Sequence, residues 1–575
     1  MMSKLIFQNL PHIISILFNF LWKIFVLIRA FIRNKLSTLS EVMEWTAYTL
    51  PFSDPTLWEY TGYIVVVVVI LWKIFSTIIP KITSKFVTTR NQKTNKILPP
   101  GPKPWPLVGS LPQKLLSDMQ AFEWIHKLME EMNTEIACIR LGNVHVIPVT
   151  SPELACLFLK EHDSIFSSRP ICMSASLVSN GYLASTFAPM GDQWMKMRRV
   201  LASHVLSQTS LQWLRPKRDE EADHILRFIY NQCINQSSTR IINMRKLTRY
   251  HCANVIKNMI FSKRLFVNED EDEKQVNALF ILFEYFHSFG ISDYLPWLSA
   301  FDLDGHTAIL KNAFATTSKY INHEVDKRIQ MWKDGNKFVE EDILDVFIML
   351  KDTNGNPLLN VKEIKDQVLE MMLAAIDNPS NAVEWTMREM LNQPNIMQRA
   401  IEEIDTIVGS NRLVQETELP RLNYVKACIK ESFRLHPVAA FNAPHVSTND
   451  ATVGKYFIPK GSLVLLSRLG LGRNPRVWED PLKFKPERHL LGDGEVVLTD
   501  SELRMLSFST GRRGCPAVKL GSTITTMLLA RLLQGFAWSS LPKSPYSNDV
   551  FGCYSLCNKP LLALAKPRLS KDMYP

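Results

Sequence analysis

The chain has 575 residues, of which 46% are hydrophobic and 21% are charged. This apolar fraction excludes a disordered chain, and 22 glycines and 32 prolines exclude collagen-like and low-complexity architectures. The net charge is +10, but no basic block interleaved with aromatic residues marks a nucleic-acid-binding face. Nine scattered cysteines without a C-x-x-C pair indicate a reducing compartment rather than a disulfide framework or a structural zinc site.

An apolar run near the N-terminus is long enough to cross a membrane. Residues 60–79 contain a block of consecutive valines and a single cation, Lys73, and a transmembrane helix needs about 20 residues. The flank before this run is acidic and the flank after it is basic, so the positive-inside rule places the rest of the chain in the cytosol. We therefore predict that residues 43–80 form a membrane anchor with one transmembrane helix.

A second apolar stretch, residues 13–32, precedes the first and contains Lys23 and Arg29. If both stretches spanned the membrane, their basic flanks would demand opposite topologies. Either the earlier stretch lies in the membrane interface, or translation of the native protein begins at Met43. The second interpretation is favoured, and residues 1–42 are then an N-terminal extension.

Prolines dominate the stretch that follows the anchor, at residues 98–106. Proline fixes φ and restricts the residue before it, so residues 81–107 are predicted to be a basic linker that ends in a rigid, non-helical hinge. No second linker or repeat follows, and residues 108–575 are expected to form one domain, mainly α with small β-sheets (α+β). Helices are expected over residues 360–391, 394–409, 423–435 and 519–533, and strands over residues 451–458 and 463–467.

A cysteine near the C-terminus lies where several features favour a thiolate. Cys515 follows a glycine-containing turn, lies beside Arg512 and Arg513, and precedes an apolar helical pattern in which Pro516 suits the first position. A helix N-terminus and cationic neighbours lower the pKa of a thiol, and a buried thiolate is a soft metal ligand. A lone cysteine is usually structural, but the spacing F-x-x-G-x-R-x-C-x-A, which begins at Phe508, argues for a ligand.

This spacing resembles the heme-binding loop of the cytochrome P450 superfamily, with Ala517 in the place of the last glycine. Other superfamily elements occur in the same order: W-x-x-x-R at residues 194–198, E-x-x-R at residues 431–434 and P-E-R at residues 486–488. The resemblance implies the cytochrome P450 fold and heme b, with Cys515 as the axial ligand of the iron. It assigns heme contacts to Trp194, Arg198, His445, Phe508, Gly511 and Arg513, and a buried charge network to Glu431, Arg434 and Arg488.

The central helix departs from the usual acid–threonine pair of the superfamily, because Asn378 and Pro379 follow Asp377. Proline clashes with the carbonyl four residues back, so we expect a kink at Ala375 that opens a groove for O₂. Asp377 is then the proton source, assisted by Asn378. The block D-N-P-S-N-A-V-E-W resembles the plant aldoxime-forming amino-acid N-monooxygenases, and residues 98–141 are most similar to the members that convert phenylalanine.

The resemblance to that family implies two N-hydroxylations of an apolar L-amino acid, followed by loss of CO₂ and water to give the (E)-aldoxime. L-Phenylalanine is the best candidate, and Leu, Ile, Trp and Tyr are further ones. The expected pocket segments are residues 173–189, the central helix, residues 439–443 and residues 552–558, and Ala443 is smaller than the residue usual in the family. The residues expected to line the pocket are Phe187, Ala375, Phe441 and Asn442.

Electrons are expected from NADPH through the partner NADPH–cytochrome P450 reductase at the endoplasmic reticulum membrane, because the chain has no flavin or dinucleotide fingerprint. A basic face for this acidic partner is predicted around Lys196, Arg199, Arg504 and Arg512. Two alternatives stay open. The chain could be a C-hydroxylase of a phenylpropanoid or terpenoid, although it lacks the relay threonine, or a non-catalytic membrane-anchored heme protein, although it keeps Cys515, Glu431 and Arg434.

Overall fold

The computed structural model of the chain describes residues 97–117, 119–235, 241–264, 270–490, 492, 494–541 and 559–575. The predicted extension and anchor, and the pocket segment 552–558, lie outside these residues. Among the residues that are described, no helix is both long and apolar enough to cross a membrane. The chain divides into two units, and helix α4 (Leu111–Leu116) is the described part of the smaller one. The larger unit comprises Lys96–Ser110 and Met119–Pro575.

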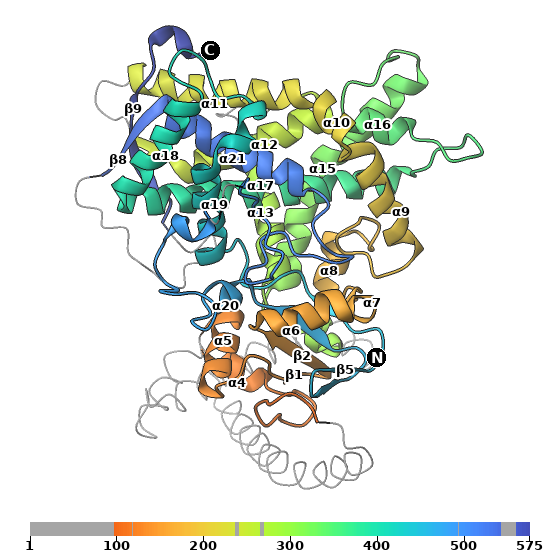
Figure 1. Cartoon of the computed structure of the whole chain (residues 1–575). Helices are drawn as coiled ribbons and strands as arrows, with labels where there is room; N and C mark the ends of the chain where they lie inside the picture. The colour runs from red at the N-terminus through yellow and green to blue at the C-terminus, as the bar shows by residue number, and fades with distance from the viewer. Residues whose placement is uncertain are drawn as a thin grey trace, which may run out of the picture. The chain divides into compact units, whose positions relative to one another are not determined.

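The larger unit is mainly helical, as the sequence predicts (Figure 1). Its first half contains α5 (Ala121–Glu131), α6 (Pro152–Cys156), α7 (Asp163–Phe166), α8 (Met173–Val178), α9 (Asp192–Val200), α10 (Gln208–Trp213), α11 (Arg215–Asn235) and α12 (Met244–Phe261). Its second half contains α13 (Asp270–His287), α14 (Ile291–Tyr294), α15 (His306–Lys333), α16 (Ile343–Met349), α17 (Val361–Asn392), α18 (Pro394–Ile407), α19 (Asn423–Leu435), α20 (Arg468–Gly472) and α21 (Val518–Gly535). Short π- and 3₁₀-helical turns include η1 (Leu157–Glu161), η2 (Leu201–Val205), η3 (Pro296–Phe301), η4 (Glu416–Arg421), η5 (Pro486–His489) and η6 (Lys571–Met573).

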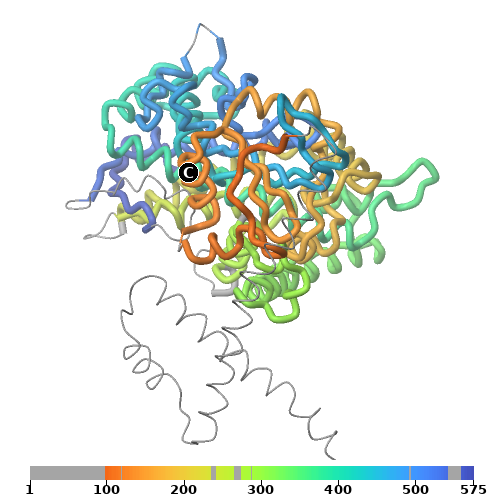
Figure 2. The backbone as a smooth tube through the Cα atoms, turned by 90° about the horizontal axis from the view of Figure 1, so that it is seen from below, coloured from red at the N-terminus to blue at the C-terminus, as the bar shows by residue number. Residues whose placement is uncertain are grey.

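Small sheets accompany the helices. The largest has the order β1 (Ile139–Leu141), β2 (Val144–Val149), β7 (Leu463–Leu466) and β4 (His445–Val446). A second has the order β3 (Ile241–Asn243), β9 (Leu562–Pro567) and β8 (Phe536–Ser540), and β5 (Ala451–Val453) pairs with β6 (Tyr456–Ile458). Strands β2 and β7 are parallel, with Val146 opposite Leu463, so they join distant parts of the chain that lie side by side in Figure 2.

The central helix α17 begins at a capping box that the sequence predicts. The Asn360 side chain accepts a hydrogen bond from the Glu363 backbone N–H at 3.0 Å, and the Glu363 carboxylate accepts one from the Asn360 N–H at 2.9 Å. The helix is continuous across Pro379. Next to this proline, the Asn378 side-chain amide donates to the Ala374 carbonyl oxygen at 2.9 Å. The helix therefore keeps an extra hydrogen bond beside the position where proline removes one.

The proline-rich stretch is non-helical, as predicted, but it is packed against the sheet rather than extended as a free hinge. The Cys138 backbone N–H donates to the Pro100 carbonyl oxygen at 2.8 Å. A Cβ atom on Gly101 would lie 1.9 Å from the Cys138 carbonyl oxygen, so only glycine fits this approach. The segment that leads into the domain is thereby held at the start of β1.

The main hydrophobic core lies where α11, α12, α17, α19 and α21 pack together, the group of helices in the upper part of Figure 1. A second apolar cluster joins β2, β5, β6 and β7 to η1. Two segments that are far apart in the sequence, around residues 185 and 440, face α17, and both are loops rather than helices. These loops supply the polar groups of the site described next.

Candidate active site

A cavity of about 300 Å³ lies between α17, the start of α21 and the two loops. Most of the predicted site residues line it: Phe187, Trp194, Arg198, Ala375, Asn378, Pro379, Asn442, His445, Phe508, Arg513 and Cys515. Three predicted residues are not among its lining residues: Asp377, Phe441 and Gly511. The predicted charge network of Glu431, Arg434 and Arg488 also lies outside the cavity wall.

Cys515 is held by the backbone of its own loop. Its N–H donates to the Phe508 carbonyl oxygen at 2.9 Å, and the Ala517 N–H donates to its Sγ at 3.3 Å. Helix α21 begins at Val518, so Pro516 precedes the helix instead of opening it. Burial raises the pKa of the Cys515 thiol, and the Ala517 N–H and the Arg198 guanidinium oppose this only in part. The predicted features that favour the thiolate are therefore present but are outweighed by burial; a bound metal ion deprotonates a coordinating thiol itself.

Gly511 serves the loop and not the cavity. Its φ of +71° lies in the left-handed region that favours glycine. An added Cβ would lie 2.6 Å from both the Leu159 carbonyl oxygen and the Asp163 side chain. The glycine of the motif thus lets the Cys515 loop approach η1 and α7.

Several arginines converge on the cavity. Arg198 donates to the Gly514 carbonyl oxygen at 2.7 Å, and Arg513 donates to the carbonyl oxygens of Ser167 at 2.6 Å and Ala188 at 2.7 Å. The Arg513 guanidinium also lies 4.6 Å from the centre of the Trp194 ring. Burial, and then repulsion from Arg169 and Arg198, lowers the pKa of Arg513 to about 9.

Arg169, which the sequence analysis missed, completes this group. It donates to the carbonyl oxygens of Ala443 and Pro444, both at 2.7 Å, and burial lowers its pKa to about 10. These buried cations repel one another, so a dianion would relieve the repulsion. A thiol sulfur and a group of guanidiniums on one apolar cavity fit heme b, which needs an axial ligand for iron and partners for two propionates.

His445, for which the resemblance implies a heme contact, lines the cavity as an uncharged group. Its Nδ1 lies 2.8 Å from the Phe166 carbonyl oxygen, which can only accept, so Nδ1 carries the proton. Burial, and then the charge of Arg169, lowers the pKa of His445 to about 3. The imidazole is therefore neutral, with Nε2 free of a proton. Arg169 brings positive charge to this side of the cavity instead.

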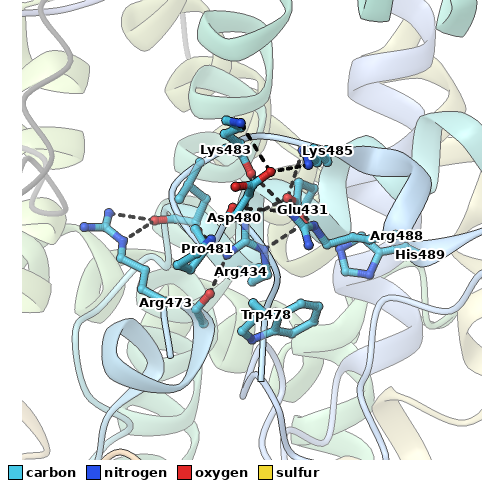
Figure 3. A network of polar contacts seen from close by, with 12 residues as sticks. Glu431, Arg434, Arg473, Trp478, Asp480, Pro481, Lys483, Lys485, Arg488 and His489 are labelled. Carbon is cyan, nitrogen blue, oxygen red and sulfur yellow. Dashed lines mark hydrogen bonds and ion pairs between the residues drawn. The ribbon is translucent and has the colours of Figure 1, made fainter. Parts of the chain in front are cut away.

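The structure brings the predicted charge network together (Figure 3). One Glu431 oxygen accepts from Arg434 at 2.7 Å and Arg488 at 3.0 Å, and the other from Arg434 at 2.8 Å and His489 at 2.8 Å. Burial opposes ionisation, but these hydrogen bonds outweigh it and lower the pKa of Glu431 to about 2. His489, which follows the P-E-R element in the sequence, is thus a fourth member of the network.

Asp377 faces away from the cavity, although Asn378 and Pro379 line it. One carboxylate oxygen accepts from the Asn381 side chain at 2.9 Å. Burial raises the pKa of Asp377 to about 7, and the charge of Arg249 on α12 opposes the rise. Asp377 therefore has no direct contact with the cavity. A proton that it supplies would have to pass around α17 to reach the cavity.

Phe441 and Asn442 point in opposite directions, as neighbours in an extended segment do. The Phe441 ring stacks on His126 with ring centres 5.1 Å apart, so its prediction as a pocket residue is wrong. Asn442 lines the cavity, donates to the Ser509 hydroxyl at 3.1 Å and accepts from Arg468 Nε at 2.5 Å. Arg468, at the start of α20, also lines the cavity and was not predicted.

Glu370 is the third lining residue that sequence reasoning missed, after Arg169 and Arg468. It accepts from the Ser185 hydroxyl at 2.7 Å and from the Thr186 N–H at 2.8 Å. Among the described residues that line the cavity, it is the only carboxylate. Its spacing of four and eight residues from Ala374 and Asn378 places it on their face of α17, and this spacing is the signal that could have found it.

Comparisons with known proteins agree with this site. The cytochrome P450 family model matches residues 99–561. The chain is 49% identical over 516 residues to isoleucine N-monooxygenase 1 of Lotus japonicus, covering 87% of this chain and 95% of that protein. It is 51% identical to two Prunus mume proteins: a tryptophan N-monooxygenase (83% of this chain, 91% of that protein) and a phenylalanine N-monooxygenase (84% and 94%). The chain therefore belongs to the cytochrome P450 family, in its group of plant amino-acid N-monooxygenases.

Proposed function

We propose that this protein N-hydroxylates an apolar L-amino acid twice and releases the (E)-aldoxime, with L-phenylalanine as the first candidate substrate. The relatives act on isoleucine, tryptophan and phenylalanine, as their names state, and their identities to this chain are nearly equal. Overall similarity therefore supports the reaction without choosing the side chain. The cavity is the place to look for that choice.

The observation that carries the proposal is a cavity with an apolar wall, a single carboxylate, and one cation besides the three arginines assigned to heme. Phe187 packs edge-to-face on Phe286, with ring centres 4.4 Å apart, and both line the cavity. Arg468, oriented by Asn442, and Glu370 provide one cation and one carboxylate in the same space. An apolar amino acid carries the matching parts: an apolar side chain, a carboxylate and an amino group. We assign its carboxylate to Arg468 and Asn442.

The chain's own residues bind and orient in this mechanism. Heme b, bound through Cys515 with Arg169, Arg198 and Arg513 near its propionates, would supply O₂ activation. The apolar walls exclude water around the substrate, which strengthens its contact with Arg468. Asp377 has a pKa of about 7, which lets it hold a proton near neutral pH. From its side of α17 it would resupply protons to the cavity on the opposite side.

Electrons would come from NADPH–cytochrome P450 reductase, with the chain anchored in the endoplasmic reticulum membrane by residues 60–79. The predicted basic face is smaller than expected. Lys196 pairs with Glu363 at 2.8 Å, and Arg504 pairs with Glu502 at 3.0 Å. Arg199 and Arg512 are the exposed members of the set, and they are our candidates for contact with the reductase.

A product assay tests the proposed function. Microsomes containing the protein, a plant reductase and NADPH would be given Phe, Tyr, Trp, Leu, Ile or Val separately, and aldoximes would be identified by mass. An aldoxime from phenylalanine, alone or with other apolar amino acids, is expected. If none forms although the reduced protein with CO shows an intact thiolate-ligated heme, the proposal fails and the C-hydroxylase alternative takes its place.

The breadth of the substrate range has its own test at Ala443, which lines the cavity. Ala443→Leu fills space beside the substrate, so it should reduce turnover of tryptophan more than turnover of valine. Equal losses for large and small substrates would show that Ala443 does not limit the substrate side chain. The same microsomal assay, run with both amino acids, measures the ratio.

A further inference from the structure

Glu370 raises a chemical question that the proposed function leaves open. At neutral pH an amino acid enters with an ammonium group, which has no lone pair to oxidise. An ammonium group in a water-poor cavity is also costly unless it is paired. The side chain that meets both needs is a carboxylate that is held in the cavity, and Glu370 is the one that the described lining offers.

We propose that Glu370 accepts a proton from the substrate's α-ammonium group and so generates the neutral amine for the first N-hydroxylation. This inference rests on the proposed function. In this step one N–H bond breaks and one carboxyl O–H bond forms, so the ammonium–carboxylate pair becomes an amine and a carboxylic acid. No oxidant or second reactant takes part in the transfer.

The contacts of Glu370 suit a proton acceptor. Ser185 donates to one of its oxygens at 2.7 Å, Gln367 donates to the same oxygen at 3.5 Å, and the Thr186 N–H donates to the other at 2.8 Å. A carboxylate has about four lone-pair sites, so these bonds aim the group and leave it the capacity to accept one more. The nearby charged groups are Arg169 and Arg513 from the surrounding loops and Asp366 from one turn earlier in α17. Burial raises the pKa of Glu370, and a carboxylate of higher pKa holds an accepted proton better.

The two oxidation steps should depend on Glu370 to different degrees. The hydroxyl group on the N-hydroxyamino acid withdraws electron density and makes its nitrogen much less basic than an amine. That nitrogen is already neutral when the second step begins. The proposal therefore separates the steps, because only the first one needs a proton acceptor.

The test compares Glu370→Gln with the unaltered protein on two substrates, the amino acid that gives aldoxime and its N-hydroxy derivative. We expect turnover of the amino acid to fall about 100-fold, the scale of a lost acid–base group, and turnover of the N-hydroxyamino acid to change little. In the variant the amino acid must bind as the rare neutral amine, so its turnover should rise about tenfold per pH unit.

A purely structural role gives a different result. Glutamine still fills the space and still accepts a hydrogen bond, so loss of a tether between α17 and the loop would slow both substrates alike and leave the pH profile flat; that result would overturn the inference. Asp366→Asn is the matched control, because Asp366 is also a buried acid of α17 but does not line the cavity. It should slow neither substrate selectively.

Two further measurements distinguish failure of the proposed function from failure of the assignment of Glu370. If the unaltered protein forms aldoxime from the N-hydroxyamino acid and from no amino acid, the proposed function fails and not the assignment of Glu370 alone. If Glu370→Gln does not retain heme, the inference is tested by the pH dependence of turnover in the unaltered protein. Its turnover of the amino acid should fall at acidic pH, where Glu370 is already protonated, while turnover of the N-hydroxyamino acid holds. Identical profiles would overturn the inference.

Discussion

Two groups of buried charges lie in this protein, and they are balanced in different ways. Around Glu431, one carboxylate is matched by Arg434, Arg488 and His489, and the remaining Arg434 donors reach backbone carbonyls of Gly472, Pro481 and Lys483. Around the cavity, four arginines face a single carboxylate and are held mainly by backbone carbonyls. In the first group Arg434, Arg488 and His489 all hydrogen-bond to the same carboxylate, whereas the second group has four cations for one carboxylate.

This difference separates a structural role from a binding role. The first group gains little from a ligand, because each of its cations already contacts the shared carboxylate of Glu431. A cluster of like charges is destabilised by mutual repulsion, and a bound anion relieves that repulsion. The relief contributes to the binding free energy of the anion. The variants below should distinguish the two groups by what they damage: folding in the first case, and binding in the second.

The largest effect is expected from Glu431→Ala. It leaves Arg434, whose side chain is fully buried, without its carboxylate, and breaking such a pair costs about 3–5 kcal/mol. The free energy of unfolding from denaturant titration measures this loss. Glu131→Ala is the control, because Glu131 pairs with Lys127 at the surface and such pairs contribute about 0–1 kcal/mol. Equal losses in the two variants would contradict the distinction.

Asp377 is an intermediate case, a buried acid that is only partly paired. Its pKa is about 7 in the folded protein against an ordinary value of 3.8, so the folded state keeps a proton that the unfolded state has released. The free energy of unfolding should therefore decrease as pH rises from about 4 to about 7, by at most about 1.4 kcal/mol per pH unit. Asp377→Asn should remove this contribution and stabilise the protein at neutral pH. Unfolding curves of both proteins across this range check the slope.

Arg513→Met tests the binding group. Removing one of several mutually repelling cations should leave the stability of the heme-free protein within about 1 kcal/mol, since methionine fills similar space and the repulsion falls. Retention of heme should drop sharply, because a partner for a propionate is lost. Heme content and unfolding of the heme-free protein are measured side by side. Arg512→Met is the control, an exposed neighbour that pairs with Asp163 and should retain heme.

The sequence predicted the elements that depend on local rules. The capping box of α17, the bounds of α19 and the Glu431–Arg434 pair each follow from residues a few positions apart. The Cys515 loop was also recognisable, because its function requires several residue types at fixed spacing. These parts of the fold and of the site needed no knowledge of the remaining chain.

What the sequence could not predict depends on distant segments. Arg169 reaches carbonyls 274 and 275 positions away, and no local pattern announces that contact. Phe441 and Asn442 could have exchanged roles, because which of two neighbours faces the cavity depends on how their segment pairs with Ser467. The charge state of His445 likewise follows from burial beside Arg169, which only the folded structure reveals.

The smallest effect is expected from Asn378→Ala, a substitution on α17 in the wall of the cavity. The variant loses the hydrogen bond to the Ala374 carbonyl, worth about 1 kcal/mol, and leaves the buried charges unchanged. Folding and heme content should therefore persist, while the ratio of aldoxime formed to NADPH consumed should fall, because Asn378 lines the cavity on the helix that carries Asp377. Asn378→Thr restores the hydroxyl usual in the superfamily and should shift the same ratio. If both variants keep the coupling of the unaltered protein, Asn378 serves only to shape the cavity, and proton supply does not pass through its side chain.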